Sequence, residues 1–88
     1  MDQADIIIKK IKTLGFPRLE IVTNEPKRYV ANLISFSNVQ CFPRSEQEWN
    51  DLGITASGFN LTWRTGFEVH VDQIIDSAEF THEIKLRA

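Results

Sequence analysis

Three residues in the second half of the chain have the types that a metal or acid–base site requires. Glu68, His70 and Asp72 occupy alternate positions, so on an extended strand their side chains project from the same face. Two carboxylates and an imidazole are ligands for divalent metals. Side chains two apart on a strand are separated by roughly 7 Å, which is wide for one ion bonded at about 2 Å. The spacing therefore favours a solvated polar face over a metal site.

A thiol nucleophile with a histidine base is the second chemistry that the residue types allow. Cys41 is the single cysteine, and His70 and His82 are the two histidines. Neither a small-residue elbow nor a paired Asn or Asp marks them as a catalytic pair. Because cysteine is among the residue types most often buried, we expect Cys41 to fill a small space in the core beside Phe42. The sequence predicts no enzyme, no cofactor and no metal.

The polar residues near position 70 belong to a stretch whose alternation predicts a β-hairpin. Apolar residues occupy every second position from 59 to 63 and from 67 to 71, and Thr65-Gly66 is a turn signal between the two runs. Since residues alternate between the faces of a strand, the apolar residues share one buried side. They are Phe59, Leu61, Trp63, Phe67, Val69 and Val71.

The opposite side of this hairpin is the predicted binding surface. Arg64 lies beside Asn60 and Thr62, with Glu68 and His70 across the turn. This mixed-charge patch suits a protein partner, although an ordinary exposed sheet face is an equally good interpretation. The predicted binding residues are Trp63, Arg64, Glu68, His70 and Asp72.

Size, charge and hydropathy limit the class of protein. The 88 residues suit one domain, and a hydrophobic content of 42% with six Phe and two Trp excludes a disordered chain. Ten basic and twelve acidic side chains give a net charge of −2, which argues against non-specific binding to nucleic acid. No segment reads as a signal peptide or a membrane span, so we expect a cytoplasmic protein without a membrane partner.

The first fifteen residues predict a helix over 3–14. Apolar residues recur at helical spacing between a capping residue, Asp2, and Gly15, where the helix would end. Three consecutive isoleucines also favour extended chain, so a strand through residues 5–11 is the alternative. The recurring residues are Ile7, Ile8, Ile11 and Leu14.

Alternation and turn residues then predict a meander of three strands over residues 18–23, 28–36 and 39–42. Ser45 and Glu48 fit a capping box, so a short helix should begin there and end in a left-handed conformation at Gly53. We expect Asp72 to cap a last helix. Residues 80–88 are predicted to be a tail or an added strand.

Residues 18–77 resemble a bacterial family, the domain of unknown function 2442. The stretch from Trp63 to Ile75 resembles its closing signature: a Trp, a Gly three residues on, an alternating run, an Asp, and an apolar pair that opens a short helix. The stretch from Leu33 to Asn38 resembles a family strand that ends in a Phe and an Asn-Gly type turn, here with Val39 in place of the usual Gly. The predicted helix in residues 1–15 lies outside the resemblance.

The resemblance implies a binding module and no particular reaction. Members of the family are largely uncharacterised, so no catalytic residue is carried over to this chain. Some are encoded beside another small domain in an arrangement like toxin and antitoxin, and some are fused to helix-turn-helix segments. The resemblance therefore implies an antitoxin-like or regulatory partner of another small bacterial protein.

The sequence as a whole predicts a single α+β domain over residues 1–88. We expect a small, twisted antiparallel sheet, made of the meander and the C-terminal hairpin, with two or three short helices packed on one face. The predicted function is a non-enzymatic protein-interaction module that binds another small protein or itself as a homodimer. The alternative is a nucleic-acid-binding accessory protein, which requires basic residues to converge in space: Lys9, Lys10, Lys12, Lys27 and Arg28.

Overall fold

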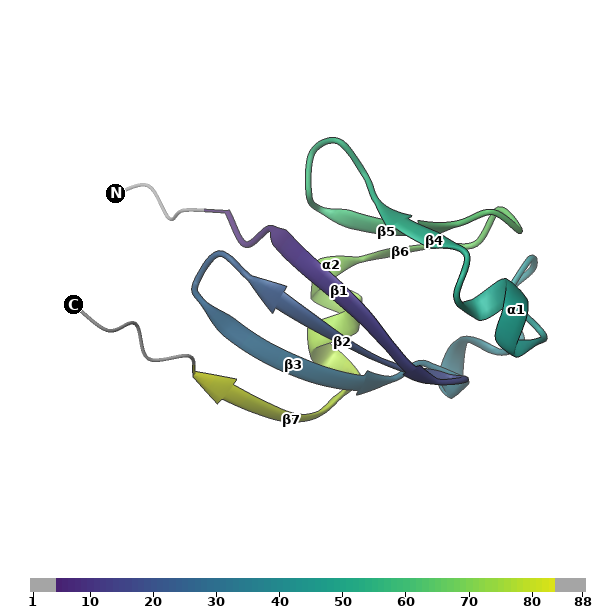
Figure 1. Ribbon diagram of the computed structural model, residues 1–88, viewed down its shortest axis with the longest axis horizontal. Coiled ribbons are helices and arrows are strands. Elements are labelled where there is room, and N and C mark those ends of the chain that lie inside the picture. The colour runs from purple at the N-terminus through teal and green to yellow at the C-terminus, as the bar shows by residue number, and fades with distance from the viewer. Residues whose placement is uncertain (1–4, 84–88) are drawn as a thin grey trace.

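The chain folds into two packed antiparallel sheets, shown as two layers in Figure 1. The computed structural model describes residues 5–83. The four-stranded sheet has the order β1-β2-β3-β7, and the three-stranded sheet has the order β4-β5-β6. The strands are β1 (Ile8–Gly15), β2 (Arg18–Thr23), β3 (Lys27–Asn32), β4 (Leu52–Ile54), β5 (Asn60–Trp63), β6 (Glu68–His70) and β7 (Ala78–Glu83). The helices are the 3₁₀ turn η1 (Ile34–Phe36), α1 (Glu46–Trp49) and α2 (Val71–Asp76).

The predicted mixture of mostly antiparallel strands and a few short helices is confirmed. The predicted single sheet is wrong, because the hairpin belongs to a sheet of its own. Both the meander and the hairpin have an apolar side, and stacking the sheets face to face buries both sides at once. The longest helix within residues 5–83, α2, has six residues, and none of the helices in this part of the chain is able to cross a membrane.

Strand β1 corrects the helix predicted over residues 3–14. Residues 8–15 pair antiparallel with β2, with Ile11 opposite Ile21 and Lys12 opposite Glu20. A β-bulge between Ile8 and Lys10 shifts the register, so the isoleucines face the core in a pattern that is not strictly alternating. The predicted capping residue, Asp2, lies outside the described residues. The β-branched isoleucines thus follow their extended preference once β2 offers backbone partners.

Strands β2 and β3 form the predicted hairpin, with the turn at residues 24–26. The predicted extended run of residues 28–36 stops early, because β3 ends at Asn32 and the chain turns into η1. The Asn32 side-chain oxygen accepts a hydrogen bond from the Ile34 backbone at 2.9 Å, which replaces a strand contact. The strand predicted over residues 39–42 is wrong: these residues are turns, and Cys41 has a positive φ of 70°.

The hairpin of β5 and β6 is confirmed, with its turn at Thr65-Gly66. Helix α1 begins as predicted, since the Ser45 hydroxyl accepts a hydrogen bond from the Glu48 backbone at 3.1 Å. The second half of the predicted capping box differs: the Glu48 carboxylate accepts from the Arg44 backbone at 2.8 Å and not from that of Ser45. Gly53 does not end this helix, however. It lies in β4, a short strand that pairs with β5 and places Gly53 opposite Thr62.

Helix α2 and strand β7 complete the four-stranded sheet. The cap of α2 is His70 and not Asp72: the His70 ring nitrogen accepts a hydrogen bond from the Asp72 backbone at 3.1 Å, and the Gln73 side chain accepts one from the His70 backbone at 2.9 Å. Strand β7 then pairs antiparallel with β3, so the predicted tail is a strand up to Glu83. Residues 84–88 lie outside the described residues.

The core lies between the two sheets and is richest in aromatic rings near α1. Trp49 and Trp63 stack with ring centroids 5.1 Å apart, and Phe42 and Phe67 meet edge to face at 5.1 Å. Of the six apolar hairpin residues, five are buried, and Phe59 is half-buried. The buried core residues are Ile8, Leu19, Ile21, Tyr29, Ala31, Leu33, Phe42, Trp49, Leu61, Trp63, Phe67, Val69, Val71 and Ile74.

Candidate functional site

Of the predicted binding residues, Trp63 is part of the core. Its side chain is 2% exposed, and its indole N–H donates a hydrogen bond to the Trp49 backbone oxygen at 2.8 Å. The Trp49 indole in turn donates a hydrogen bond to the Arg18 backbone oxygen at 2.9 Å. These two hydrogen bonds link β5 of one sheet to β2 of the other through Trp49. Burial follows from the alternation of the hairpin, which directs Trp63 inward and its neighbour Arg64 outward.

Arg64 lies at the outer end of β5, and its side chain is 87% exposed. Its guanidinium is 3.9 Å from the Asp51 carboxylate, and its backbone N–H donates a hydrogen bond to the Asp51 backbone oxygen at 3.0 Å. Together with Glu48 and Thr65 these two residues line a small depression of about 240 Å³. The exposure of both charged groups means that solvent weakens their attraction strongly.

Glu68 and His70 lie on β6 and Asp72 lies in the first turn of α2, and the side chains of Glu68 and His70 are each engaged with a neighbour. The Glu68 carboxylate accepts a hydrogen bond from the Asn60 side chain across the hairpin. His70 caps α2, lies 3.6 Å from the Asp72 carboxylate and stacks against the Phe59 ring. Among residues 5–79, whose side chains the structure describes, no cluster of three or more histidine, cysteine, aspartate or glutamate side chains is placed to hold a metal ion.

Cys41 is exposed, which corrects its predicted place in the core. It lies in a turn, where its backbone oxygen accepts a hydrogen bond from the Thr65 hydroxyl at 2.6 Å. A β-carbon added to Gly66 would lie 3.5 Å from the Cys41 sulfur, so the thiol packs over the hairpin turn. The local turn geometry, and not the hydropathy of cysteine, decides its position.

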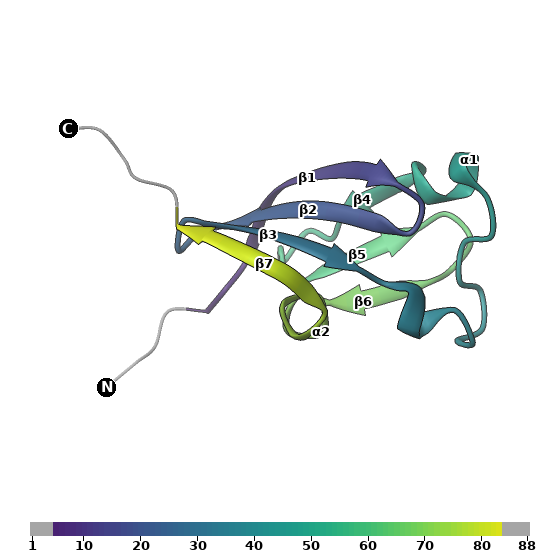
Figure 2. The same ribbon diagram turned by 90° about the horizontal axis from the view of Figure 1, so that it is seen from below.

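A second surface, the outer face of the four-stranded sheet, gathers basic side chains from two strands. We define this outer face by the side chains that point away from the core on β1, β2 and β3. Lys10 is opposite Val22, which is opposite Arg28, so these residues form one row across the sheet. Lys12 is opposite Glu20 in the next row along β1 and β2. Figure 2 shows this sheet in front, with none of the described helices lying over it.

Three of the five basic residues of the predicted nucleic-acid site therefore come together: Lys10, Lys12 and Arg28. Lys27 does not join them, because it neighbours Arg28 on β3 and points to the other side, 3.9 Å from Glu25. Lys9 is exposed but is the additional residue of the β-bulge and does not line the depression described next. The convergence depends on β1 being a strand, since a helix would have scattered the lysines around its axis.

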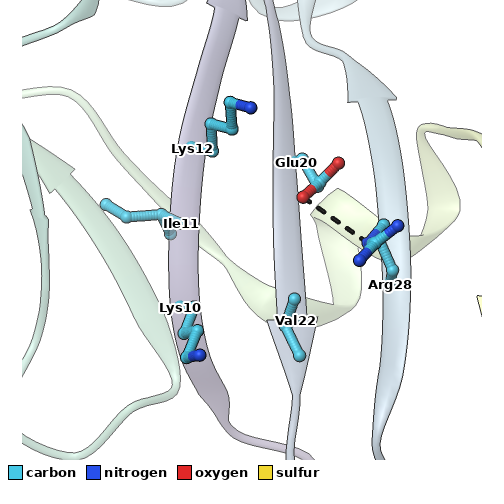
Figure 3. Close-up of a pocket in the computed structure, with 6 residues that line it drawn as sticks. All are labelled: Lys10, Ile11, Lys12, Glu20, Val22 and Arg28. Carbon is cyan, nitrogen blue, oxygen red and sulfur yellow. Dashed lines mark ion pairs between the residues drawn. The ribbon is translucent and has the colours of Figure 1, made fainter. Parts of the chain in front are cut away.

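The basic side chains of the outer face surround a shallow depression of about 420 Å³, shown in Figure 3. Its floor is Val22 on β2, and Ile11 borders it on the β1 side. The residues that line it are Lys10, Ile11, Lys12, Glu20, Val22 and Arg28.

Charge on the outer face is only partly matched. Glu20 is the cross-strand neighbour of Lys12, yet its carboxylate is directed to Arg28 at 3.6 Å, the pair joined by the dashed line in Figure 3. Arg18 binds Glu79 with two hydrogen bonds, the shorter of 2.8 Å. Among the ion pairs that the described residues form, none includes Lys10 or Lys12.

The inner side of the same sheet has one strongly perturbed titratable group. The Tyr29 hydroxyl donates a hydrogen bond to the Glu25 carboxylate at 2.6 Å. Burial, the hydrogen bond and the charge of Glu25, in that order, raise the pKa of Tyr29 to about 12. Tyr29 is 6% exposed, so it belongs to the core and not to a binding surface.

Sequence reasoning missed Glu20 and Val22 as members of a surface site. Both alternate with the buried Leu19 and Ile21 in β2, which is the signal that identifies them as outward-facing. Their significance depends on the lysines of β1, and those lysines can be placed only when β1 is known to be a strand.

No protein-family model, no curated protein and no solved structure matches the chain.

Proposed function

We propose that the chain is a non-enzymatic protein-interaction module whose partner binds on the outer face of the four-stranded sheet. The observation that carries this proposal is the combination of Lys10 and Lys12, unpaired among the described residues, with a depression floored by Val22. Basic side chains around an apolar floor offer both charge and contact area to another protein.

The polar side of the β5–β6 hairpin is the weaker candidate surface for the same function. We call it the hairpin patch, made of Arg64, Glu68, His70 and Asp72. Glu68 and His70 already bind neighbouring groups in the chain, and a partner that uses them must break those contacts before it gains new ones. On the outer face, the lysine ammonium groups lose only water. This difference supports a partner on the four-stranded sheet.

An antitoxin-like or regulatory role is the biological form of the proposal, and it rests on the resemblance to the domain of unknown function 2442. Its partner is then another small protein encoded next to this chain. Co-expression of the two gene products followed by size-exclusion chromatography tests the role. We expect one peak that contains both proteins, whereas two separate peaks and no rescue of growth contradict it.

A homodimer is the other protein complex that the proposal allows. Light scattering on the purified chain across a range of concentrations measures its mass in solution. A mass that doubles with concentration indicates that the second copy is the partner, and a constant monomer mass assigns the outer face to a different protein.

Nucleic-acid binding is a second candidate function, favoured by the convergence of Lys10, Lys12 and Arg28. Two carboxylates, those of Glu20 and Glu79, lie on the same face and repel phosphates. Fluorescence anisotropy with labelled duplex and single-stranded DNA at low and high salt tests this function. Binding that falls steeply with salt supports it, and the absence of binding at low salt removes it.

A further inference from the structure

We infer that the outer face of the four-stranded sheet binds an extended acidic segment of its protein partner, with carboxylates at Lys10, Lys12 and Arg28. This inference rests on the proposed function and names the chemistry of the partner. The three cationic side chains come from two strands and border one depression. Their opposite in charge is a chain segment that presents several carboxylates on one side.

The spacing of the lysines matches an extended peptide. Lys10 and Lys12 are two residues apart on β1, so their Cα atoms are separated by roughly 7 Å. An extended peptide repeats its side chains on one side at the same interval. Aspartate or glutamate at alternate positions therefore places successive carboxylates at the two lysines.

Arg28, the third cation, and Val22, the apolar floor, set the width of the ligand. Val22 separates Lys10 from Arg28 across the sheet, so the two cations are about two strand spacings, roughly 10 Å, apart. A small apolar side chain of the ligand fits over Val22 between them. The recognised pattern is then acidic and apolar residues in alternation, with a further carboxylate directed towards Arg28.

The apolar floor distinguishes this ligand from nucleic acid. Glu20 lies beside Lys12 and 3.6 Å from the Arg28 guanidinium, so its carboxylate repels phosphates and ligand carboxylates alike. A phosphate backbone offers no apolar side chain to Val22, whereas a peptide that alternates acidic and apolar residues does.

The test is fluorescence anisotropy with a short labelled peptide in which aspartate alternates with valine. Exposed ion pairs contribute up to about fivefold each in affinity at low salt, so we expect Lys10→Gln/Lys12→Gln to weaken binding several-fold, up to about 25-fold. The matched control is Lys27→Gln/Arg44→Gln, which removes two positive charges away from the depression. We expect this control to stay within about twofold of the original chain.

Glu20→Gln should change the affinity for the peptide in the opposite direction, which makes it the more discriminating variant. Removing this carboxylate frees Arg28 and ends its repulsion of the ligand, so we expect tighter peptide binding by roughly threefold to fivefold. Asp51→Asn removes one negative charge that lines the other depression and is its control. A merely structural role for Glu20 would weaken binding or leave it unchanged.

Several outcomes overturn the inference. One is equal weakening by the two double variants, which means that only net charge matters. Another is equal binding of a peptide with asparagine in place of aspartate. A third is tighter binding of duplex DNA than of the acidic peptide with the same dependence on Lys10 and Lys12. Circular dichroism melting of each variant verifies that the fold is retained.

The inference and the proposed function fail in different ways. If the co-expressed complex forms and survives Lys10→Gln/Lys12→Gln, the chain is an interaction module that uses another surface. If the acidic peptide binds and the neighbouring gene product does not, the acidic ligand is correct and the proposed partner is wrong.

Discussion

The outer faces of the two sheets differ in how their polar side chains are matched. On the three-stranded sheet, Glu68 binds Asn60 and His70 binds the Asp72 backbone. On the four-stranded sheet, Lys10 and Lys12 form no ion pair with a described residue. Both faces are polar and exposed, so composition does not separate them. The comparison teaches that a surface able to bind is identified by charges that the fold leaves unmatched.

The largest loss of stability is expected for Trp63, a predicted binding residue that the structure places in the core and not in the hairpin patch. Trp63→Ala removes a buried indole and its hydrogen bond to Trp49, so we expect a loss of about 3–5 kcal/mol in the free energy of unfolding. Urea unfolding followed by circular dichroism measures it. Arg64→Ala, one residue along the strand, is the control. A loss below about 1 kcal/mol for Trp63→Ala would place the indole at the surface and restore it as a binding residue.

Tyr29 tests how well the inner side of the four-stranded sheet is shielded from solvent, in contrast to the exposed outer face. Its folded pKa is about 12 and its unfolded pKa is about 10, so the stabilisation is complete below pH 10 and is lost as the pH rises to 12. The shift corresponds to about 2–3 kcal/mol. Because Tyr29 is the single tyrosine, the ultraviolet absorbance of tyrosinate reports its titration directly.

The control for this titration is the same chain in denaturant, where the midpoint should return to about 10. Glu25→Gln should lower the folded midpoint only in part, since burial is the leading cause of the shift. A folded midpoint near 10 would show that solvent reaches the hydroxyl.

His70 tests whether the hairpin patch is structural. His70→Ala removes the cap of α2, and we expect a loss of about 1 kcal/mol in the free energy of unfolding. His70→Asn supplies another good capping side chain and should recover most of this loss. Equal losses in the two variants would mean that the ring's contact with Phe59, and not the cap, accounts for the effect.

Arg64 has the smallest expected effect. Arg64→Gln breaks an exposed ion pair with Asp51 that is 3.9 Å long, so stability should change by less than about 0.5 kcal/mol. Binding of the acidic peptide should also be unchanged, because Arg64 belongs to the other sheet. Loss of peptide binding in this variant would erase the distinction between the two faces.

Local signals explain which parts of the fold were predictable from the sequence. The hairpin and the start of α1 were predicted correctly because Thr65-Gly66 and the Ser45 cap act within a few residues. Strand β1 was predicted only as the alternative to a helix, because the isoleucines at its start satisfy a helical spacing as well as a strand preference. Only the pairing with β2, which is a contact between distant residues, decides between the two. Strand β4 is three residues long and has no pattern of its own.

The same difference between local signals and contacts of distant residues applies to the candidate sites. Arg64 and Asp72 were correctly expected to be exposed, although neither lies on a strand: Arg64 follows β5 in the hairpin turn, and Asp72 is in the first turn of α2. Alternation does not reveal partners, so the pairing of Glu68 with Asn60 followed only from the structure. The gathering of Lys10, Lys12 and Arg28 was likewise hidden, because it needs both the strand β1 and its register.

Strand β7 is the fourth strand of its sheet, yet it follows β4, β5, β6 and α2 in the chain. During synthesis on the ribosome, β3 is therefore made long before its second neighbour. Its backbone donors and acceptors stay open in the meantime, and an open edge recruits strands from other nascent chains. A stop codon ahead of residue 78 would make that exposure permanent, and insoluble aggregate is the expected product of such a truncation.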